Sequence, residues 1–262
     1  HVYLMMNKCE DVVCSNKDGI HSTVFDLVPE EYKTSSMGGE LHCVGRLDID
    51  TEGLLLLTTD GSLTHKLISP KTHIPKTYHV KLQKGLSLRE QTKYTEVFQK
   101  GMFVPAEGNE SEFTALPAQL IWPSEENGSY LTENGPESCE VLITIYEGKY
   151  HQVKRMFAAC GNQVIKLKRL SIGGLYLDSG LTLGQCRELT QEEIDLTFDK
   201  PYIFLITFNI FPEPSVFNNS FPSLINLNFI KGYDKAILLT YSITCDNSEL
   251  LLDKCFNLAG VL

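Results

Sequence analysis

Strand-like segments dominate the first 146 residues of this chain, and this pattern constrains the fold more than any other feature. Period-two alternation or dense runs of β-formers predict strands at 3–7, 41–48, 53–59, 77–82, 114–122 and 140–146. No regular series of helices joins them, as the crossovers of a doubly wound parallel sheet would require. We therefore expect an α+β fold with a mixed, mainly antiparallel sheet and flanking helices.

Helices are signalled mainly by their ends. Capping-box pairs predict two helix starts, Ser87 with Glu90 and Thr190 with Glu193. The first of these helices should end at Gly101, and 150–160 is predicted to be a further helix that ends before Gly161. Asp60 and Gly61 predict a turn after the apolar run 54–57.

The formal net charge of -10 argues at first against a nucleic-acid partner, but the charges are unevenly placed. Residues 61–89 hold six basic and no acidic side chains, and 147–170 hold six basic and one acidic. Residues 105–140 instead hold eight Glu and no Lys or Arg, as an acidic insertion would. Either basic block alone would favour a solvated face, but the two together are predicted to flank a nucleic-acid groove.

The chain is expected to have a functional domain at 1–197 and an unassigned extension at 198–262. Its eight Cys never form Cys-x-x-Cys, which favours reduced, mostly buried thiols and a cytoplasmic location over a disulfide framework or a zinc site. Apolar runs such as 54–57 are far shorter than the roughly 20 residues of a membrane span. The chain opens without Met, so we expect its natural start to lie upstream.

Three charged residues follow one another at alternate positions in Gly-Arg-Leu-Asp-Ile-Asp: Arg46, Asp48 and Asp50. On an extended segment they would share one face, and the guanidinium would hold a neighbouring carboxylate ionised. Such an aspartate can act as a nucleophile, a general base or a metal ligand, or can simply pair with Arg46 at a corner. A glycosidase-type carboxylate pair of Asp48 and Asp50 is a further, weaker reading.

Two further segments carry candidate chemistry. In Lys76-Thr-Tyr-His, Tyr78 could stack on a base or pack in the core. In Glu147-Gly-Lys-Tyr-His-Gln-Val-Lys-Arg, a helix would place His151 and Arg155 on one side. Cations at a helix start oppose its dipole, so Lys154 and Arg155 are expected to point at an anion or to form an ordinary basic face.

These motifs together resemble the bacterial ribosomal small subunit pseudouridine synthase A family. The resemblance is carried by Gly-Arg-Leu-Asp-Ile-Asp-Thr-Glu-Gly-Leu-Leu-Leu-Leu-Thr-Thr-Asp-Gly at 45–61, with Met-Asn-Lys at 6–8 before it. It continues through Lys-Thr-Tyr at 76–78, the segment 147–157, Ile-Gly-Gly at 172–174 and Leu-Thr-Gln-Glu-Glu at 189–193. It covers about residues 1–197 in one consistent order.

The resemblance implies an enzyme that isomerises a uridine of ribosomal RNA to pseudouridine, acting as a monomer on that RNA or a pre-ribosomal particle without a cofactor or metal. Asp48 matches the nucleophile, Tyr78 the tyrosine that stacks on the target base, and Lys154 the cation that pairs with the aspartate. The remaining side chains expected at the substrate are Arg46, His151, Arg155 and Ile172.

The sequence departs from that family at several points. Cys9 and Asp11 stand where the family usually has Pro and Gly, which should alter the loop, and the small RNA-binding domain that usually comes first is expected to be absent. These departures leave two alternatives open. One is a catalytically retired homologue that only binds RNA or assists ribosome assembly, and the other is a synthase acting on large-subunit RNA.

Overall fold

The computed structural model describes residues 1–33, 39–122, 131–132, 135–136, 138–199, 207–208, 225–227 and 239–241. The chain divides into two compact units, His1–Pro201 and Tyr202–Leu262. In the second unit, the described residues form a sheet in which β18 (Leu239–Tyr241) pairs with β16 (Thr207–Phe208) and β17 (Ile225–Leu227). Every predicted site residue belongs to the first unit.

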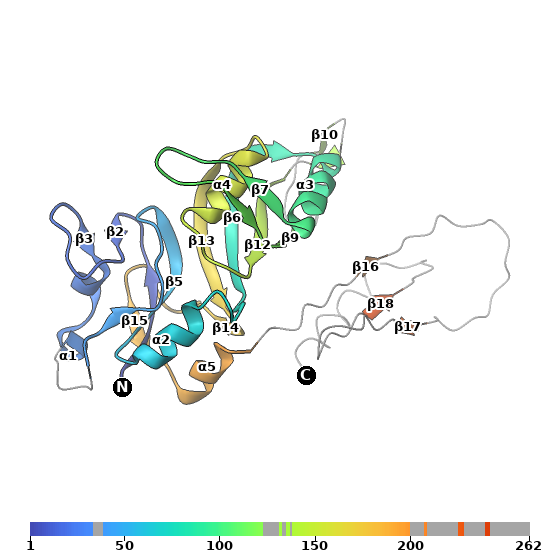
Figure 1. The fold of residues 1–262 in the computed structure, drawn as a ribbon. Coiled ribbons are helices and arrows are strands. Elements are labelled where there is room, and N and C mark those ends of the chain that lie inside the picture. The colour runs from blue at the N-terminus through green and yellow to red at the C-terminus, as the bar shows by residue number, and fades with distance from the viewer. Residues whose placement is uncertain are drawn as a thin grey trace, which may run out of the picture. The chain divides into compact units, whose positions relative to one another are not determined.

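The described part of the first unit is built on a nine-stranded sheet (Figure 1). Its path runs β15 (Cys186–Glu188), β1 (Tyr3–Lys8), β5 (Thr51–Thr58), β13 (Val164–Ile172), β6 (Lys76–Leu86), β12 (Ser138–Ile145) and β9 (Gln119–Ile121). Two short strands lie off this path, β14 (Leu175–Tyr176) beside β13 and β4 (His42–Cys43) beside β5. Only β5 and β13 pair in parallel within this sheet, so the predicted mixed, mainly antiparallel α+β fold is confirmed.

Helices cover both faces of the sheet, and the sheet between them separates the core into two clusters. One cluster contains residues of α3 (Leu88–Lys100) and α4 (Gln152–Ala159), and the other contains residues of α2 (Gly61–Ile68) and α5 (Gln191–Leu196) (Figure 1). On β5, Leu55 and Leu57 join the first cluster, whereas Leu54 and Leu56 join the second. The uninterrupted apolar run follows from this double coverage, since successive strand side chains point to opposite faces.

The remaining elements are short. They are β2 (Val12–Val13) parallel to β3 (Ser22–Thr23), β7 (Met102–Val104) antiparallel to β8 (Phe113–Ala115), β10 (Leu131–Thr132) with β11 (Gly135–Pro136), the 3-10 helix η1 (Val24–Leu27) and α1 (Glu30–Lys33). The predicted capping boxes at Ser87 and Thr190 are confirmed, and Gly101 ends α3 with φ +75°. Residues 123–130, 133–134 and 137 of the predicted acidic insertion 105–140 lie outside the described residues.

Several sequence-based boundaries are wrong for identifiable reasons. The predicted strand 41–48 shrinks to β4, because the chain turns at Gly45 with φ +75° and leaves the sheet. The predicted strand 114–122 is split into β8 and β9, because Pro117 lies between them and cannot donate a ladder hydrogen bond. The predicted turn at Asp60 is the start of α2, where the Asp60 carboxylate accepts from the amides of Ser62 and Leu63.

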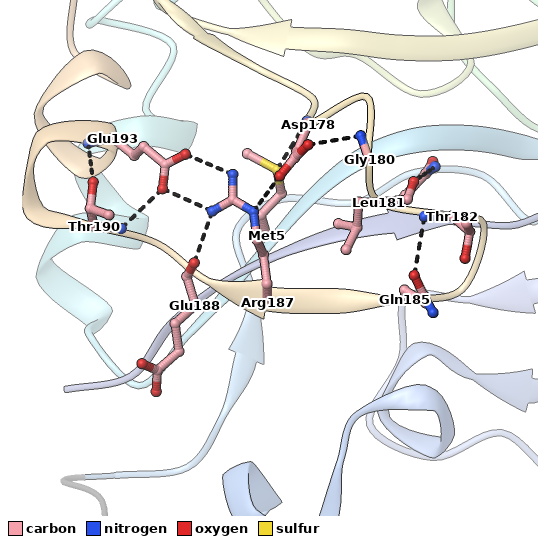
Figure 2. Close-up of polar contacts among 11 residues, drawn as sticks. Met5, Asp178, Gly180, Leu181, Thr182, Gln185, Arg187, Glu188, Thr190 and Glu193 are labelled. Atoms are coloured by element: carbon pink, nitrogen blue, oxygen red, sulfur yellow. Dashed lines mark hydrogen bonds and ion pairs between the residues drawn. The ribbon is translucent and has the colours of Figure 1, made fainter.

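One ion-pair cluster fastens the end of the unit to the sheet edge (Figure 2). Arg187 on β15 donates to Asp178 at 2.7 Å and to both carboxylate oxygens of Glu193 in α5, at 2.7 and 2.9 Å. The adjoining loop reaches β1, because Gly184 donates its amide to the carbonyl of Asn7 at 2.7 Å. The cluster therefore braces the strand that ends in Lys8.

Among the described residues, no helix combines the length and apolar content needed to cross a membrane.

Candidate active site

Asp48 lies in the loop between β4 and β5, and a buried lysine holds that loop in place. Lys8, at the end of β1, has no exposed surface. Its ammonium donates to the carbonyls of Asp48 at 3.0 Å and Thr51 at 2.9 Å, and contacts those of Cys9 at 3.0 Å and Ile49 at 3.4 Å. Burial lowers the pKa of Lys8, but these carbonyls give the ammonium a dense set of acceptors. The backbone around Asp48 is therefore fixed from below.

Helix α4 supplies the groups that face Asp48. Val153, Met156 and Phe157 are buried at the i, i+3, i+4 spacing, and the Phe157 ring lies 4.9 Å from that of Phe98 in α3. This packing leaves Lys154 on the side of the helix toward the loop. His151 precedes the helix with φ +47°, a left-handed conformation that is costly for a residue other than glycine and is often found at functional sites.

The two segments meet in a cluster of charges. Lys154 Nζ lies 3.1 Å from Asp48 Oδ2 and 2.5 Å from Asp50 Oδ1, and His151 Nε2 lies 3.5 Å from Asp48 Oδ1. Burial alone would lower the pKa of Lys154, but the hydrogen bond to Asp50 and the charge of Asp48 raise it above its ordinary value. Burial alone would raise the pKa of Asp50, but the hydrogen bond from Lys154 lowers it.

This arrangement suits a nucleophilic carboxylate. The Asp48 side chain is 28% exposed, so an incoming group can approach a carboxylate that is also anchored by a cation. Lys154 stays protonated near neutral pH because its pKa is raised. A charged, oriented and partly exposed carboxylate is what attack on an electrophilic carbon requires.

Tyr78 and Ile172 occupy different parts of the core. Tyr78 on β6 is 7% exposed and belongs to the same core cluster as Leu47 and Val153, the neighbours of Asp48 and Lys154. Its hydroxyl has no hydrogen-bond partner among the described residues, which leaves it available to a substrate. Ile172 is 2% exposed in the other cluster, so this placement does not support its predicted contact with substrate.

The structure corrects the predicted pair of Arg46 with Asp48 and gives Arg155 a structural role. Arg46 is exposed and lies in the loop rather than on a strand face, and no ion pair joins it to Asp48 within the described residues, so the predicted guanidinium–carboxylate pair is replaced by the pair with Lys154. Arg155 is 4% exposed, and its guanidinium donates to the carbonyls of Pro105 at 2.8 Å and Ser111 at 2.7 Å. Arg155 therefore anchors the chain around residues 105–111.

The altered Cys9–Asp11 loop keeps a glycine-like shape at one position. Asp11 has φ +63°, and its amide donates to the carbonyl of Ile49 at 2.9 Å. Asp tolerates the left-handed region better than most residues, because its short polar side chain can bond locally. Asp11 thus holds a left-handed conformation that glycine would adopt without strain.

The two basic blocks contain both exposed and buried side chains. The exposed members are Lys66, Lys71, Lys81, Lys84, Arg89, Lys149 and Lys166. Lys166 and Lys81 are cross-strand partners on β13 and β6, so part of both blocks shares one sheet face. The buried Arg169 donates from Nε to the carbonyl of Leu54 at 2.7 Å, so the second block is less available to RNA than its composition indicates.

Lys8 and Gly53 are functional supports that the sequence reasoning did not single out. Gly53, with φ +102°, packs so closely on β13 that a Cβ would collide with the Arg169 carbonyl oxygen. A lysine in the apolar strand 3–8 and a glycine before four leucines were the available signals.

Within the described ranges, no group of three or more His, Cys, Asp or Glu is placed to hold a metal ion. The six described cysteines are free, five of them half-buried and Cys139 exposed.

Comparison with known proteins identifies the family of this chain. The family model described as RNA pseudouridylate synthase matches residues 2–159. The Vibrio vulnificus (strain CMCP6) protein named ribosomal small subunit pseudouridine synthase A is 46% identical over 194 residues, covering 74% of this chain and 72% of that protein. The protein of the same name from Escherichia coli (strain K12) is 42% identical over 194 residues, covering 73% of this chain and 72% of that protein.

The fold gives the same result. A crystal structure of a pseudouridylate synthase is 38% identical, superposes with a TM-score of 0.59, and covers 75% of this chain and 73% of that one. Asp48 and Asp50 bind the same ammonium, so their geometry alone does not separate a synthase from a glycosidase-type pair. The sequence and fold matches do separate them: the chain belongs to the RNA pseudouridylate synthase family.

Proposed function

We propose that this chain isomerises one uridine of ribosomal RNA to pseudouridine, and that the RNA is that of the small ribosomal subunit. The observation that carries the proposal is the ion pair of Asp48 with Lys154, at the two positions where the family resemblance expects the nucleophile and its cation. The choice of the small subunit is supported by relatives named for it, which align with about three quarters of the chain.

In the proposed mechanism, the Asp48 carboxylate is the nucleophile. It attacks either the uracil ring or the anomeric carbon of the ribose while the glycosidic C–N bond breaks. The uracil turns within the site and rejoins the ribose through its C5 carbon, and the bond to Asp48 breaks, which frees the carboxylate. The proton displaced from C5 goes to a proton acceptor, and the former glycosidic nitrogen takes up a proton. Tyr78 is the proposed acceptor of the displaced proton and the ring on which the uracil stacks. Leaving the RNA stack costs a few kcal/mol, which stacking on an aromatic ring partly offsets.

The electrostatics of the site are compatible with this chemistry. Lys154 and His151 hold the carboxylate from two sides, so that its orientation is set before the base arrives. Base and ribose never leave the site, so no activated donor is needed. The proposed enzyme acts as a monomer on ribosomal RNA or a pre-ribosomal particle in the cytoplasm.

The proposal is tested by mapping pseudouridines in ribosomal RNA from cells with and without this gene. We expect one pseudouridine of small-subunit RNA to disappear on deletion and to return with the wild-type gene. Loss of a site in large-subunit RNA would correct the substrate. Loss of none would favour a retired homologue that only binds RNA.

A further inference from the structure

A hollow of about 360 Å³ lies next to the Asp48–His151 contact. It is lined by Glu107, Gly108, Asn109, Glu110, Tyr150 and His151. Since His151 also lies 3.5 Å from the Asp48 carboxylate, the hollow begins where the reacting centre ends. Its size falls in the range of small-molecule sites. No role in the isomerisation proposed above uses it.

One wall of the hollow is a pair of stacked rings. The Tyr150 and His151 ring centroids are 3.8 Å apart with an interplanar angle of 21°. Tyr150 is nonetheless 55% exposed, so much of the ring contacts no other part of the protein. The segment is held from both sides, because Gln152 accepts from the amide of Lys149 and donates to the carboxylate of Glu147. A fixed, exposed aromatic ring beside the nucleophile is suited to stacking on a nucleobase.

The facing wall is an acidic hairpin turn. Glu107 and Glu110 exchange both backbone hydrogen bonds, at 3.0 and 2.9 Å, around Gly108, whose φ of +58° suits a tight turn. Arg155 fixes this turn, since it binds the carbonyls on either side of it and its Nε lies 3.7 Å from the Glu107 carboxylate. Because Arg155 directly follows Lys154, the turn is tied to the helix that carries the catalytic cation.

The charge of the turn selects the kind of ligand. Two carboxylates beside the hollow repel a phosphate but accept hydrogen bonds from amino groups. Adenine, guanine and cytosine carry an exocyclic amino group, whereas uracil presents carbonyl oxygens at the corresponding positions. The combination of a stacking ring and an acidic edge therefore fits a base with an amino group rather than the RNA backbone.

We propose that this hollow binds the base of a nucleotide adjacent to the target uridine, stacked on Tyr150 with its amino group toward the 107–110 turn. The inference rests on the proposed function, because it takes RNA as the substrate. It assigns a specificity role to Tyr150 and the turn, and a positioning role to Arg155.

The test uses short RNAs, drawn from a sequence that the wild-type protein modifies, in which each base beside the target uridine is varied in turn. The wild-type protein, Tyr150→Ala, Tyr150→Phe and Tyr176→Ala are compared by kcat/KM for pseudouridine formation and by RNA binding in fluorescence anisotropy. Tyr176 is a matched control, since it is 62% exposed and does not line the hollow.

On one side of the target, the wild-type protein should prefer adenine, guanine or cytosine over uracil. Tyr150→Ala should reduce kcat/KM roughly 5- to 150-fold, mainly through KM, which is the range for loss of one stacking aromatic, and should flatten the preference. Tyr150→Phe should retain more activity than Tyr150→Ala, because the phenyl ring still stacks. Tyr176→Ala should keep the preference of the wild-type protein.

Unchanged kcat/KM and neighbour preference in Tyr150→Ala would overturn this inference and leave the proposed function standing. RNA that is bound in a Tyr150-dependent way but never modified would overturn the proposed function alone. RNA that is neither modified nor bound in this way would overturn both.

Discussion

Lys154 Nζ lies 3.1 Å from Asp48 Oδ2, although 106 positions separate the two residues in the sequence. The same ammonium also binds Asp50, so two carboxylates share one cation. The geometry makes Lys154 the electrostatic centre of the site.

Replacing Lys154 by Met should reduce kcat by roughly 30- to 1000-fold, which corresponds to about 2–4 kcal/mol. The reason is that Asp48 and Asp50 would face each other without their shared cation. Lys154→Arg should retain more activity, because the positive charge remains. The loss of kcat is measured in single-turnover assays on an RNA that the wild-type protein modifies. Lys93→Met, at an exposed position on α3, is the control. Equal rates in Lys154→Met and the control would contradict the assigned role.

Replacing Lys8 by Met should destabilise the protein by about 3–5 kcal/mol, because the carbonyls around Asp48 lose their buried donor. The thermal midpoint should fall, and the residual folded protein should have a lower kcat because the Asp48 loop is no longer fixed. Lys66→Met, at an exposed position on α2, should stay within about 0.5 kcal/mol of wild type. If urea unfolding gave both variants the same midpoint, the support attributed to Lys8 would be wrong.

Replacing Gly53 by Ala should cost at least about 3 kcal/mol, because the new Cβ would meet the β13 backbone and the positive φ is strained for alanine. Gly61→Ala makes a matched control, since no atom lies within 4 Å of the position that its new methyl group would take and it is the first residue of α2. That variant should be neutral or slightly stabilising. Equal unfolding midpoints for the two variants would contradict this, because they would mean that β5 can move away from β13 with no loss of stability.

Lys76 gives a pH-dependent prediction. Burial, reinforced by the charge of Arg169, lowers the pKa of Lys76 from 10.5 to about 8 in the folded state. The folded protein therefore resists the charged form, and this cost is complete below pH 8 and disappears above about pH 10.5. Lys76→Met should gain stability relative to wild type at pH 7, and the gain should shrink by pH 10. A pH-independent difference in the free energy of unfolding would contradict this.

The sequence predicts the fold class because alternation and apolar runs report which faces are buried. It misses β13, although Leu167 between Lys166 and Lys168 has the alternation of a strand with one wet face. The basic residues were attributed to RNA binding instead. Strand ends were also misplaced where Gly45 and Pro117 redirect the chain, because such punctuation fixes a change of direction but not its geometry.

The sequence predicts some residues of the candidate site and not others. Motif resemblance selected Asp48 and Lys154, and the structure brings them together. The anchoring role of Arg155 could not be predicted, because its partners are backbone carbonyls and the sequence gives no sign of which carbonyls a side chain will meet. The same limit concealed Lys8, whose role depends on a loop 40 residues away.

The most direct test of the account is pseudouridine formation by Asp48→Asn on an RNA that the wild-type protein modifies. The amide is nearly isosteric with the carboxylate but is not a comparable nucleophile, so we expect no pseudouridine above background while RNA binding persists. Wild-type pseudouridine formation by Asp48→Asn would contradict the central claim that Asp48 is the nucleophile.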